Sequence, residues 1–205
     1  YTCTFVKQEV IKGVTKPEQE MTAKFMGDPY SVALTWTKNP PTGDKVLYVE
    51  GKNNNQMIVR PANAFLRKLV NGAVLRQPDG AEAMNTTLRP VNMFGFERSI
   101  KSLLEIYALA QKQNELKQSC DGMAKVGDRQ ALVLVRLLPD KPEYASAAVK
   151  TLIYIDTEYL VPIRIEGYDA DGKPNSVYTS SNIKFNLGLT EADFLPEAND
   201  MVQPK

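Results

Sequence analysis

The sequence contains no histidine, and this absence limits the chemistry that its other side chains can perform. Histidine is the usual general base near neutral pH, the partner of nucleophilic serine and cysteine, and a frequent ligand of zinc, copper and non-haem iron. Most hydrolase mechanisms are therefore disfavoured. We expect a protein that is not an enzyme and that carries no cofactor.

One run of residues has the spacing of a phosphate-binding loop up to its final position. The run GYDADGKP begins at Gly167, and its last residue, Pro174, replaces the hydroxyl side chain that would bind magnesium. Such a loop joins a strand to a helix, whereas strand patterns flank this Asp-Gly turn, so the run predicts a β-hairpin. Asp169 and Asp171 also lack the twelve-position ligand series of an EF-hand calcium site.

Two other near-matches to functional motifs have structural explanations. Ser181 and Lys184 have the Ser-x-x-Lys spacing of penicillin-binding nucleophiles, but positions i and i+3 of a strand point to opposite faces. The acidic run near the C-terminus begins with TEAD, from Thr190 to Asp193, which is typical of a capping box that starts a short helical turn. We therefore predict no catalytic residue and no metal ligand.

Composition indicates one domain over residues 1–205, because the chain is 43% hydrophobic and long enough to bury a substantial core. Its 25 basic and 24 acidic residues are balanced, so we expect no nucleic-acid partner. The longest apolar run is far shorter than the ~20 residues that cross a bilayer, so no transmembrane segment is expected.

Apolar and polar residues alternate along most of the chain between short turns, which predicts a meandering antiparallel sheet. The fold class is therefore α+β, with a large sheet and few helices. The predicted strands are Thr2–Ile11, Gln19–Met26, Ser31–Thr37, Lys45–Glu50, Gln56–Arg60, Gly122–Val126, Gln130–Leu138, Val149–Asp156, Pro162–Tyr168 and Ser176–Leu187.

A single long segment has helical periodicity instead. Apolar residues recur from Phe96 at i+4, i+7, i+8 and i+11, which predicts an amphipathic helix over Phe96–Leu116. Leu109 and Leu116 form a second apolar line, so we expect this helix to be contacted from two sides. The stretch Ala64–Val74 fits either a short helix or two short strands, and the sequence leaves the choice open.

The candidate binding residues are apolar, because the sequence offers little else. On predicted strands, alternation places several large side chains on shared faces, and the long helix carries the opposing stripe. Ordinary core packing is the alternative explanation for each of them, although seven methionines suit a surface that accommodates varied apolar ligands. The predicted cavity residues are Val32, Leu34, Trp36, Tyr48, Met57, Phe96, Ile100, Leu104 and Tyr107.

Four stretches carry a resemblance to a bacterial protein family. They are YTCTFVKQE from Tyr1, KVLYVEG from Lys45, LVPIRIEGYD from Leu160 and NIKFNLGLTEADF from Asn182. They resemble an exported family that is catalogued only as a domain of unknown function and is grouped with the LolA and LolB type of periplasmic lipoprotein carriers. The resemblance covers nearly the whole chain, but its motifs carry no known chemistry.

The resemblance implies a strongly curved antiparallel sheet, an incomplete barrel, wrapped around the long helix and short helical segments. In the carriers, an apolar cavity between the sheet and the helices takes up acyl chains. Arg89-Pro90 stands where relatives have Arg-His-Pro, so this chain lacks that histidine. The expected location is the bacterial periplasm or cell envelope, with the export signal removed ahead of Tyr1.

Cys3 and Cys120 have neither zinc-ligand spacing nor the form of a redox motif. Under the export that the resemblance implies, a disulfide between them is expected, and two thiols in a reducing compartment are the alternative. The leading functional hypothesis is a non-enzymatic envelope protein that carries or senses a lipid, a lipoprotein acyl chain or another amphiphile. The alternative is a module with a filled core and no ligand that binds a protein partner.

Overall fold

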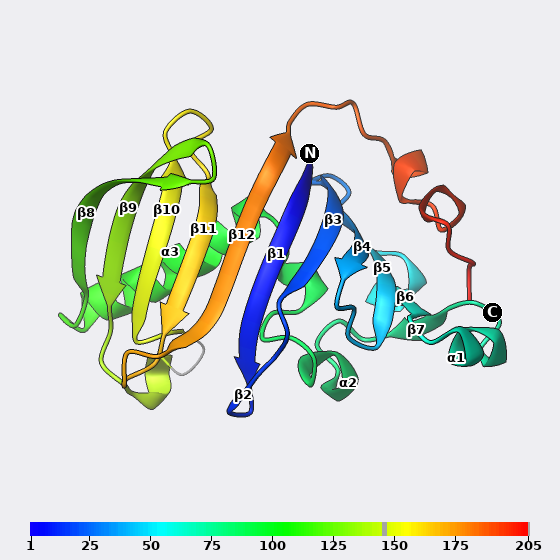
Figure 1. Ribbon diagram of the computed structural model, residues 1–205, viewed down its shortest axis with the longest axis horizontal. Coiled ribbons are helices and arrows are strands. Elements are labelled where there is room, and N and C mark those ends of the chain that lie inside the picture. The colour runs from blue at the N-terminus through cyan, green and yellow to red at the C-terminus, as the bar shows by residue number, and fades with distance from the viewer. Residues whose placement is uncertain (145–146, 205) are drawn as a thin grey trace. The chain divides into compact units, whose positions relative to one another are not determined.

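The computed structural model in Figure 1 describes residues 1–144 and 147–204. Its strands form one open, mostly antiparallel, 12-stranded sheet in the order β7-β6-β5-β4-β3-β1-β12-β11-β10-β9-β8, with β2 paired to β1. One long helix and several short helical segments accompany the sheet. The predicted fold class, an α+β protein built on an antiparallel sheet with one long helix, is confirmed.

The chain divides into two compact units, and the long strands β1 (Thr2–Ile11) and β12 (Pro174–Lys184) contribute to both. Unit 1 contains residues 1–6, residues 17–94 and the chain from Asn182 onward. Unit 2 contains residues 7–16 and 95–181. That residues 1–205 act as a single domain stays a prediction.

Unit 1 holds the N-terminal strands and the short helices. Its complete strands are β3 (Gln19–Met26), β4 (Ser31–Lys38), β5 (Gly43–Val49), β6 (Met57–Pro61) and β7 (Val74–Arg76). Its helical segments are η1 (Asn53–Asn55), α1 (Ala64–Leu69), α2 (Ala81–Met84), η2 (Val91–Met93), η4 (Glu191–Phe194) and η5 (Glu197–Asn199).

One face of the unit 1 strands packs against the segment around η2. Tyr30 is buried in this core cluster, and its hydroxyl contacts the carbonyl oxygens of Val91 at 3.0 Å and Phe94 at 2.7 Å. Because a buried hydroxyl is costly without such partners, these contacts fix the η2 segment over the sheet. The buried members of this cluster are Cys3, Met21, Ala23, Tyr30, Val32, Leu34, Val46, Tyr48 and Met57.

The opposite face of the same strands is covered by the C-terminal segment. Phe194 and Met201 pack there against Ala33, Leu47 and Ile58. The segment begins at η4 with the predicted capping box. The Thr190 side chain accepts a hydrogen bond from the Asp193 N–H, and the Asp193 side chain accepts one from the Thr190 N–H. Strands β4 and β5 are consequently buried on both faces, which explains their nearly continuous apolar sequence.

Unit 2 holds the long helix α3 (Phe96–Lys112) and the remaining strands. Figure 1 shows α3 running behind strands β9 to β11. The unit's own strands and short helix are β2 (Val14–Thr15), β8 (Lys117–Val126), β9 (Arg129–Leu137), β10 (Lys150–Asp156), β11 (Pro162–Tyr168) and η3 (Pro142–Tyr144).

Helix α3 ends at Lys112, four residues before the predicted end at Leu116. Asn114 adopts a left-handed backbone with φ of 58°, and the Glu115 N–H donates to the Ala110 carbonyl at 2.9 Å. This geometry is a C-terminal helix cap, because it satisfies carbonyl groups of the last turn. Leu116 therefore lies beyond the helix, where it packs with Leu109 against a small buried cluster, Ala110, Leu138 and Tyr144.

Strand β8 is five residues longer at its N-terminal end than predicted and forms one edge of the sheet. Its residues are exposed or half-exposed on both faces, so its sequence has no apolar alternation to reveal it. The pairing with β9 shifts register between Cys120 and Met123, where Gly122 has a φ of 80°. This irregularity is a β-bulge, which bends the strand and interrupts its ladder.

The undecided stretch Ala64–Val74 contains a six-residue helix, α1, followed by the start of the short strand β7. Leu66, Leu69 and Val70 gave the helical periodicity, and Gly72 ends the helix with a φ of 106°. Among the residues that the structure describes, no helix is long and apolar enough to cross a membrane.

Candidate functional site

The residues that resembled catalytic motifs have structural roles instead. The Asp169 N–H donates to the Lys173 carbonyl at 3.0 Å, and the Asp169 carboxylate accepts from the N–H groups of Asp171 at 3.0 Å and Lys173 at 2.8 Å. The run is therefore the turn of the β11–β12 hairpin, as predicted. Ser181 and Lys184 both lie on strand β12, which rules out a shared helix face.

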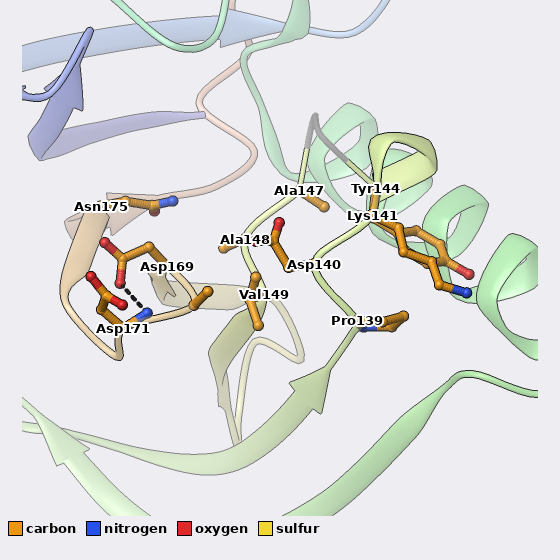
Figure 2. Close-up of a pocket in the computed structure, with 11 residues that line it drawn as sticks. Pro139, Asp140, Lys141, Tyr144, Ala147, Ala148, Val149, Asp169, Asp171 and Asn175 are labelled. Carbon is orange, nitrogen blue, oxygen red and sulfur yellow. Dashed lines mark hydrogen bonds between the residues drawn. The ribbon is translucent and has the colours of Figure 1, made fainter.

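A pocket of about 300 Å³ lies beside this hairpin turn, and Figure 2 shows the residues that line it. Asp169 and Asp171 line it from the turn, and Tyr144 of η3 and the preceding Lys141 line it on the other side. The Asp169 carboxylate is occupied by the turn itself, as the dashed line to Asp171 shows. No group of three or more possible metal ligands occurs among the described residues.

The more informative site of unit 2 lies between α3 and the β8–β9 strands. The Tyr107 ring of α3 lies 5.6 Å from the Arg136 guanidinium of β9, which shows which face of the sheet α3 contacts. Leu134 and Leu132 share this face with Arg136, because residues two apart on a strand point the same way. The α3 face of the sheet is therefore defined by the even-numbered residues of β9.

This face of the sheet is apolar and incompletely covered. Strand pairing joins Cys120, Leu134, Ile153 and Ile165 into one row across β8 to β11. Ile153 is buried, but Leu134 and Ile165 are half-exposed and Cys120 is exposed. Leucine and isoleucine side chains thus form a surface that unit 2 does not bury completely.

At the β1 side of unit 2, the buried groups become charged. Tyr178 of β12 donates to Glu9 at 2.7 Å, and Glu9 also accepts from Lys7 at 2.8 Å. Lys7 and Glu9 are both buried, and their pairing offsets part of the cost of removing two charges from water. The apolar strands of unit 2 therefore end at a buried ion pair.

Helix α3 is strongly amphipathic, but its apolar side is only lightly buried. Phe96, Ile100 and Tyr107 are half-exposed, and Leu104 is 59% exposed. Ala110 is the one buried residue of α3, all of whose 17 residues the structure describes. A surface helix normally buries its apolar stripe against the core, so this helix has apolar surface left over.

A pocket of about 320 Å³ lies next to Tyr107, where α3 meets the open edge of the sheet. We call it the α3 groove. Its wall includes the Tyr107 ring and, on the α3 face of the sheet, the Leu134 side chain with the amide of Gln118 and the thiol of Cys120. The lining residues are Tyr107, Gln118, Ser119, Cys120, Leu134 and Val135.

Arg136 supplies a buried positive charge beside the groove. Its Nη2 donates to Thr151 Oγ1 at 2.6 Å, and its guanidinium faces the Tyr107 ring. Burial raises the pKa of the Tyr107 phenol, and the nearby Arg136 charge partly opposes that rise. Tyr107 is therefore a neutral hydrogen-bonding group at physiological pH.

The predicted sheet residues of the cavity all lie in unit 1. Val32, Leu34, Tyr48 and Met57 are buried members of its first core cluster. Trp36 is half-buried against that cluster, and its Nε1 donates to Gln19 Oε1 at 2.9 Å. The structure thus brings these five residues together, and the side chains of unit 1 itself surround them.

The predicted helix residues Phe96, Ile100, Leu104 and Tyr107 lie on α3 in unit 2. Tyr107 lines the α3 groove. That these four residues and the five of unit 1 enclose one ligand cavity stays a prediction. Gln118 and Ser119 carry no sequence signal because β8 is polar and has no periodicity, and Leu134 and Val135 lie on a predicted strand whose pattern does not single them out.

The expectation of a disulfide is wrong, because the structure does not join Cys3 to Cys120. Cys3 is buried in the first core cluster of unit 1, where it packs with apolar neighbours. Cys120 is exposed on β8 and lines the α3 groove. Sequence spacing gave no information on how these two side chains are oriented, and a disulfide depends on that orientation.

Comparisons with known proteins identify a family and a fold. The sequence profile of a family described as "Protein of unknown function (DUF1571)" matches residues 1–202. No curated protein matches this chain. Among solved structures, MucB has a TM-score of 0.53 at 13% identity, covering 95% of this chain and 56% of that chain.

Two further solved structures show the same likeness. The complex of Pseudomonas aeruginosa MucA and MucB gives a TM-score of 0.51 at 14% identity, covering 97% of this chain and 56% of that chain. An uncharacterized conserved protein from Thermus thermophilus gives 0.50 at 13% identity, covering 94% and 83%. At such identities the likeness shows the fold alone, and this chain spans about half the length of MucB.

Proposed function

Since this chain belongs to the DUF1571 family of proteins of unknown function, as the match over residues 1–202 shows, we propose its function from its geometry. It is a non-enzymatic cell-envelope protein that carries or senses an amphiphile. The apolar chain of a lipid or of a lipoprotein lies in the α3 groove and on the apolar surface beside it.

The observation that carries this proposal is the poor burial of α3. A 17-residue amphipathic helix with one buried residue leaves apolar surface in water, although the half-exposed leucine and isoleucine residues of β9 to β11 lie on the opposing sheet face. An apolar ligand between the two surfaces would remove both from water. Each methylene group buried in this way contributes about 0.8 kcal/mol.

The size and composition of the groove support a single chain rather than a bulky ligand. Its volume of about 320 Å³ is at the lower end of the range of roughly 300–1,000 Å³ for small-molecule sites. Gln118 at the rim offers an amide to a polar headgroup, while Tyr107 and Leu134 contact the chain. Amphiphiles combine these two requirements.

The substitution Cys120→Trp tests this assignment, because an indole at this exposed position fills the groove without removing a core residue. We expect the variant to bind the environment-sensitive fluorophore 1-N-phenylnaphthylamine at least about tenfold more weakly, since losing roughly two methylene contacts has that effect. Fluorescence titration measures the affinity, and native mass spectrometry of the purified protein shows whether it retains amphiphile.

The matched control is Lys125→Trp, which adds an indole to an exposed residue of the same strand outside the groove lining. We expect its affinity for the fluorophore to equal that of the unmodified protein. Equal binding by Cys120→Trp and the unmodified protein would contradict the groove assignment. An unmodified protein that neither binds the fluorophore nor retains amphiphile would contradict the function.

A second candidate function is the binding of a protein partner without a lipid ligand. Two observations favour it: unit 1 fills its first core cluster with its own side chains, and the structurally similar MucB has been solved in complex with MucA. Under this function, native mass spectrometry of protein purified from envelope extracts would show stoichiometric protein complexes, and the unmodified protein would not bind the fluorophore.

A further inference from the structure

Helix α1 of unit 1 turns large apolar side chains toward solvent. Phe65 is 74% exposed, Leu69 is 69% exposed and Leu66 is 49% exposed. Phe65 and Leu69 are four residues apart, so they lie on the same side of the helix. Single exposed apolar residues are common on protein surfaces, but three on one helix of six residues form a patch.

This exposure is not the result of a loosely held segment, because α1 is capped at both ends. The Asn63 side chain accepts from the N–H groups of Phe65 at 2.9 Å and Leu66 at 3.1 Å. At the other end the Gly72 N–H donates to the Arg67 carbonyl at 2.8 Å, with Gly72 in a left-handed conformation. These contacts satisfy backbone groups that a short helix would otherwise leave unpaired.

The polarity of α1 is inverted relative to an ordinary surface helix. Of its two charged residues, Lys68 is exposed, but Arg67 points back to the protein, where its Nε donates to the Pro61 carbonyl at 3.0 Å and its Nη2 donates to Asp44 at 2.9 Å. The apolar residues Phe65 and Leu69 point outward. An amphipathic helix usually turns its apolar side to the core, so the outward apolar side of α1 is unusual.

The apolar surface continues into the C-terminal segment. Val202 lies directly over Gly72, at the end of α1, and a side chain at Gly72 would meet the Val202 methyl at 2.8 Å. Val202 is itself 55% exposed. We call these residues, Phe65, Leu66, Leu69 and Val202, the α1 patch.

Positively charged residues lie on helix α1 and at its base. Asp44 pairs with both Arg60 and Arg67, at 2.8 Å and 2.9 Å, so two guanidinium groups share one carboxylate. Lys68 on α1 adds another positive charge and forms no ion pair with a described residue. This group of four charged residues carries a net charge of +2, which complements an anionic surface.

From this combination we propose that the α1 patch docks on the surface of an anionic lipid bilayer, with Phe65, Leu66 and Leu69 in the boundary between headgroups and acyl chains. Interfacial segments of this kind pair phenylalanine and leucine on one side with lysine and arginine nearby. A six-residue helix is only ~9 Å long, whereas a stable protein interface uses roughly 20–30 residues on each side. The patch suits a bilayer better than a protein.

This inference goes beyond the proposed function, because it concerns residues of unit 1 and not the α3 groove. A protein that carries amphiphiles must meet membranes, but docking and ligand binding can fail separately. Docking can therefore be measured with vesicles and without a bound ligand, and the groove variants should leave docking unchanged.

The test is vesicle flotation of the whole chain with the double substitution Phe65→Ser and Leu69→Ser. With vesicles of phosphatidylethanolamine and phosphatidylglycerol, we expect the unmodified protein to float with the lipid and the variant to bind at least about tenfold more weakly. The matched control is Leu160→Ser, which removes a leucine that is 72% exposed in unit 2, and it should float like the unmodified protein. Circular dichroism melting confirms that the variants are folded.

The variant Lys68→Glu tests the electrostatic part of the proposal. Its binding to the anionic vesicles should fall severalfold, whereas its binding to phosphatidylcholine vesicles should not change. An unmodified protein that does not float, or a double variant that floats equally well, overturns the proposal. A concentration-dependent dimer of the unmodified protein that is lost in the double variant would assign the patch to a second copy of the chain and also overturn it.

Discussion

Replacing Asp156 with alanine is expected to lower the free energy of unfolding by about 2–4 kcal/mol. Asp156 is fully buried in unit 2 and accepts from Arg129 at 2.6 Å and 2.7 Å. It also accepts from the N–H groups of Glu158 at 2.9 Å and Tyr159 at 2.8 Å. The alanine would leave four donors without this acceptor, although Arg129 keeps partial contact with water.

Urea denaturation measures this loss, and Asp171→Ala is the matched control because the Asp171 side chain is exposed on the hairpin turn. The control should change the free energy of unfolding by about 0.5 kcal/mol or less. A comparable loss in both variants would show that the Asp156 network does not hold unit 2 together.

The same carboxyl group makes stability depend on acid. The hydrogen bonds from Arg129 lower the pKa of Asp156 to about 2, from a usual value of 3.8. A folded-state pKa below the unfolded value contributes stability that is complete above pH ~4 and is lost as the pH falls through about 2. Between those limits, unfolding of Asp156→Ala should depend less on pH than unfolding of the unmodified protein.

Replacing Tyr48 with alanine is expected to cost about 3–5 kcal/mol, because it would leave a large cavity in the first core cluster of unit 1. Its ring packs edge-on against the Tyr30 ring, with centroids 5.9 Å apart. Leu104→Ala on α3 should cost about 0.5 kcal/mol or less, since Leu104 is 59% exposed. Thermal and urea unfolding of both variants measure the difference.

This pair of substitutions separates core residues from ligand-binding residues within the predicted cavity set. Leu104→Ala should weaken binding of the fluorophore while it preserves stability, and Tyr48→Ala should mainly reduce stability. If Tyr48→Ala were nearly neutral for stability and abolished binding, the ligand would lie in unit 1 and not beside α3.

The strands were predictable wherever one face or both faces are buried. β1, β3 and β11 begin and end at the predicted residues, because their apolar residues are regularly placed and turn residues bound them. β8 was only half predicted, because it lies at the sheet edge and buries neither face. A pattern of burial cannot reveal a strand that is not buried.

For the candidate cavity residues, the sequence could predict strand faces but not tertiary neighbours. Alternation correctly put Val32 and Leu34 on one face of β4, but it could not show that Tyr30 and Phe94 would pack against the cluster on that face. That packing joins residues more than 60 positions apart. The groove beside Tyr107 depends equally on distant contacts, and its edge strand carries no periodic signal.

For helix α1, the sequence pattern allowed a helix but did not show which side of it faces the core. Leu66 and Leu69 gave the correct periodicity for a helix, yet periodicity alone assumes that the apolar side faces the core. Here the anchor is Arg67, whose partner Asp44 lies 23 positions away. Only the Arg67–Asp44 ion pair of the folded chain shows that the apolar side of α1 points outward.

The bulge in β8 bears on self-association, because the α3 groove lies at an open edge of the sheet. An unpaired edge is a template for adding strands from other molecules, and this is how cross-β assemblies grow. The register shift divides the β8 ladder into Lys117–Cys120 and Met123–Val126, which are out of step with each other. A straight incoming strand can follow one of these short segments but not both, so the edge that borders the groove resists polymerisation.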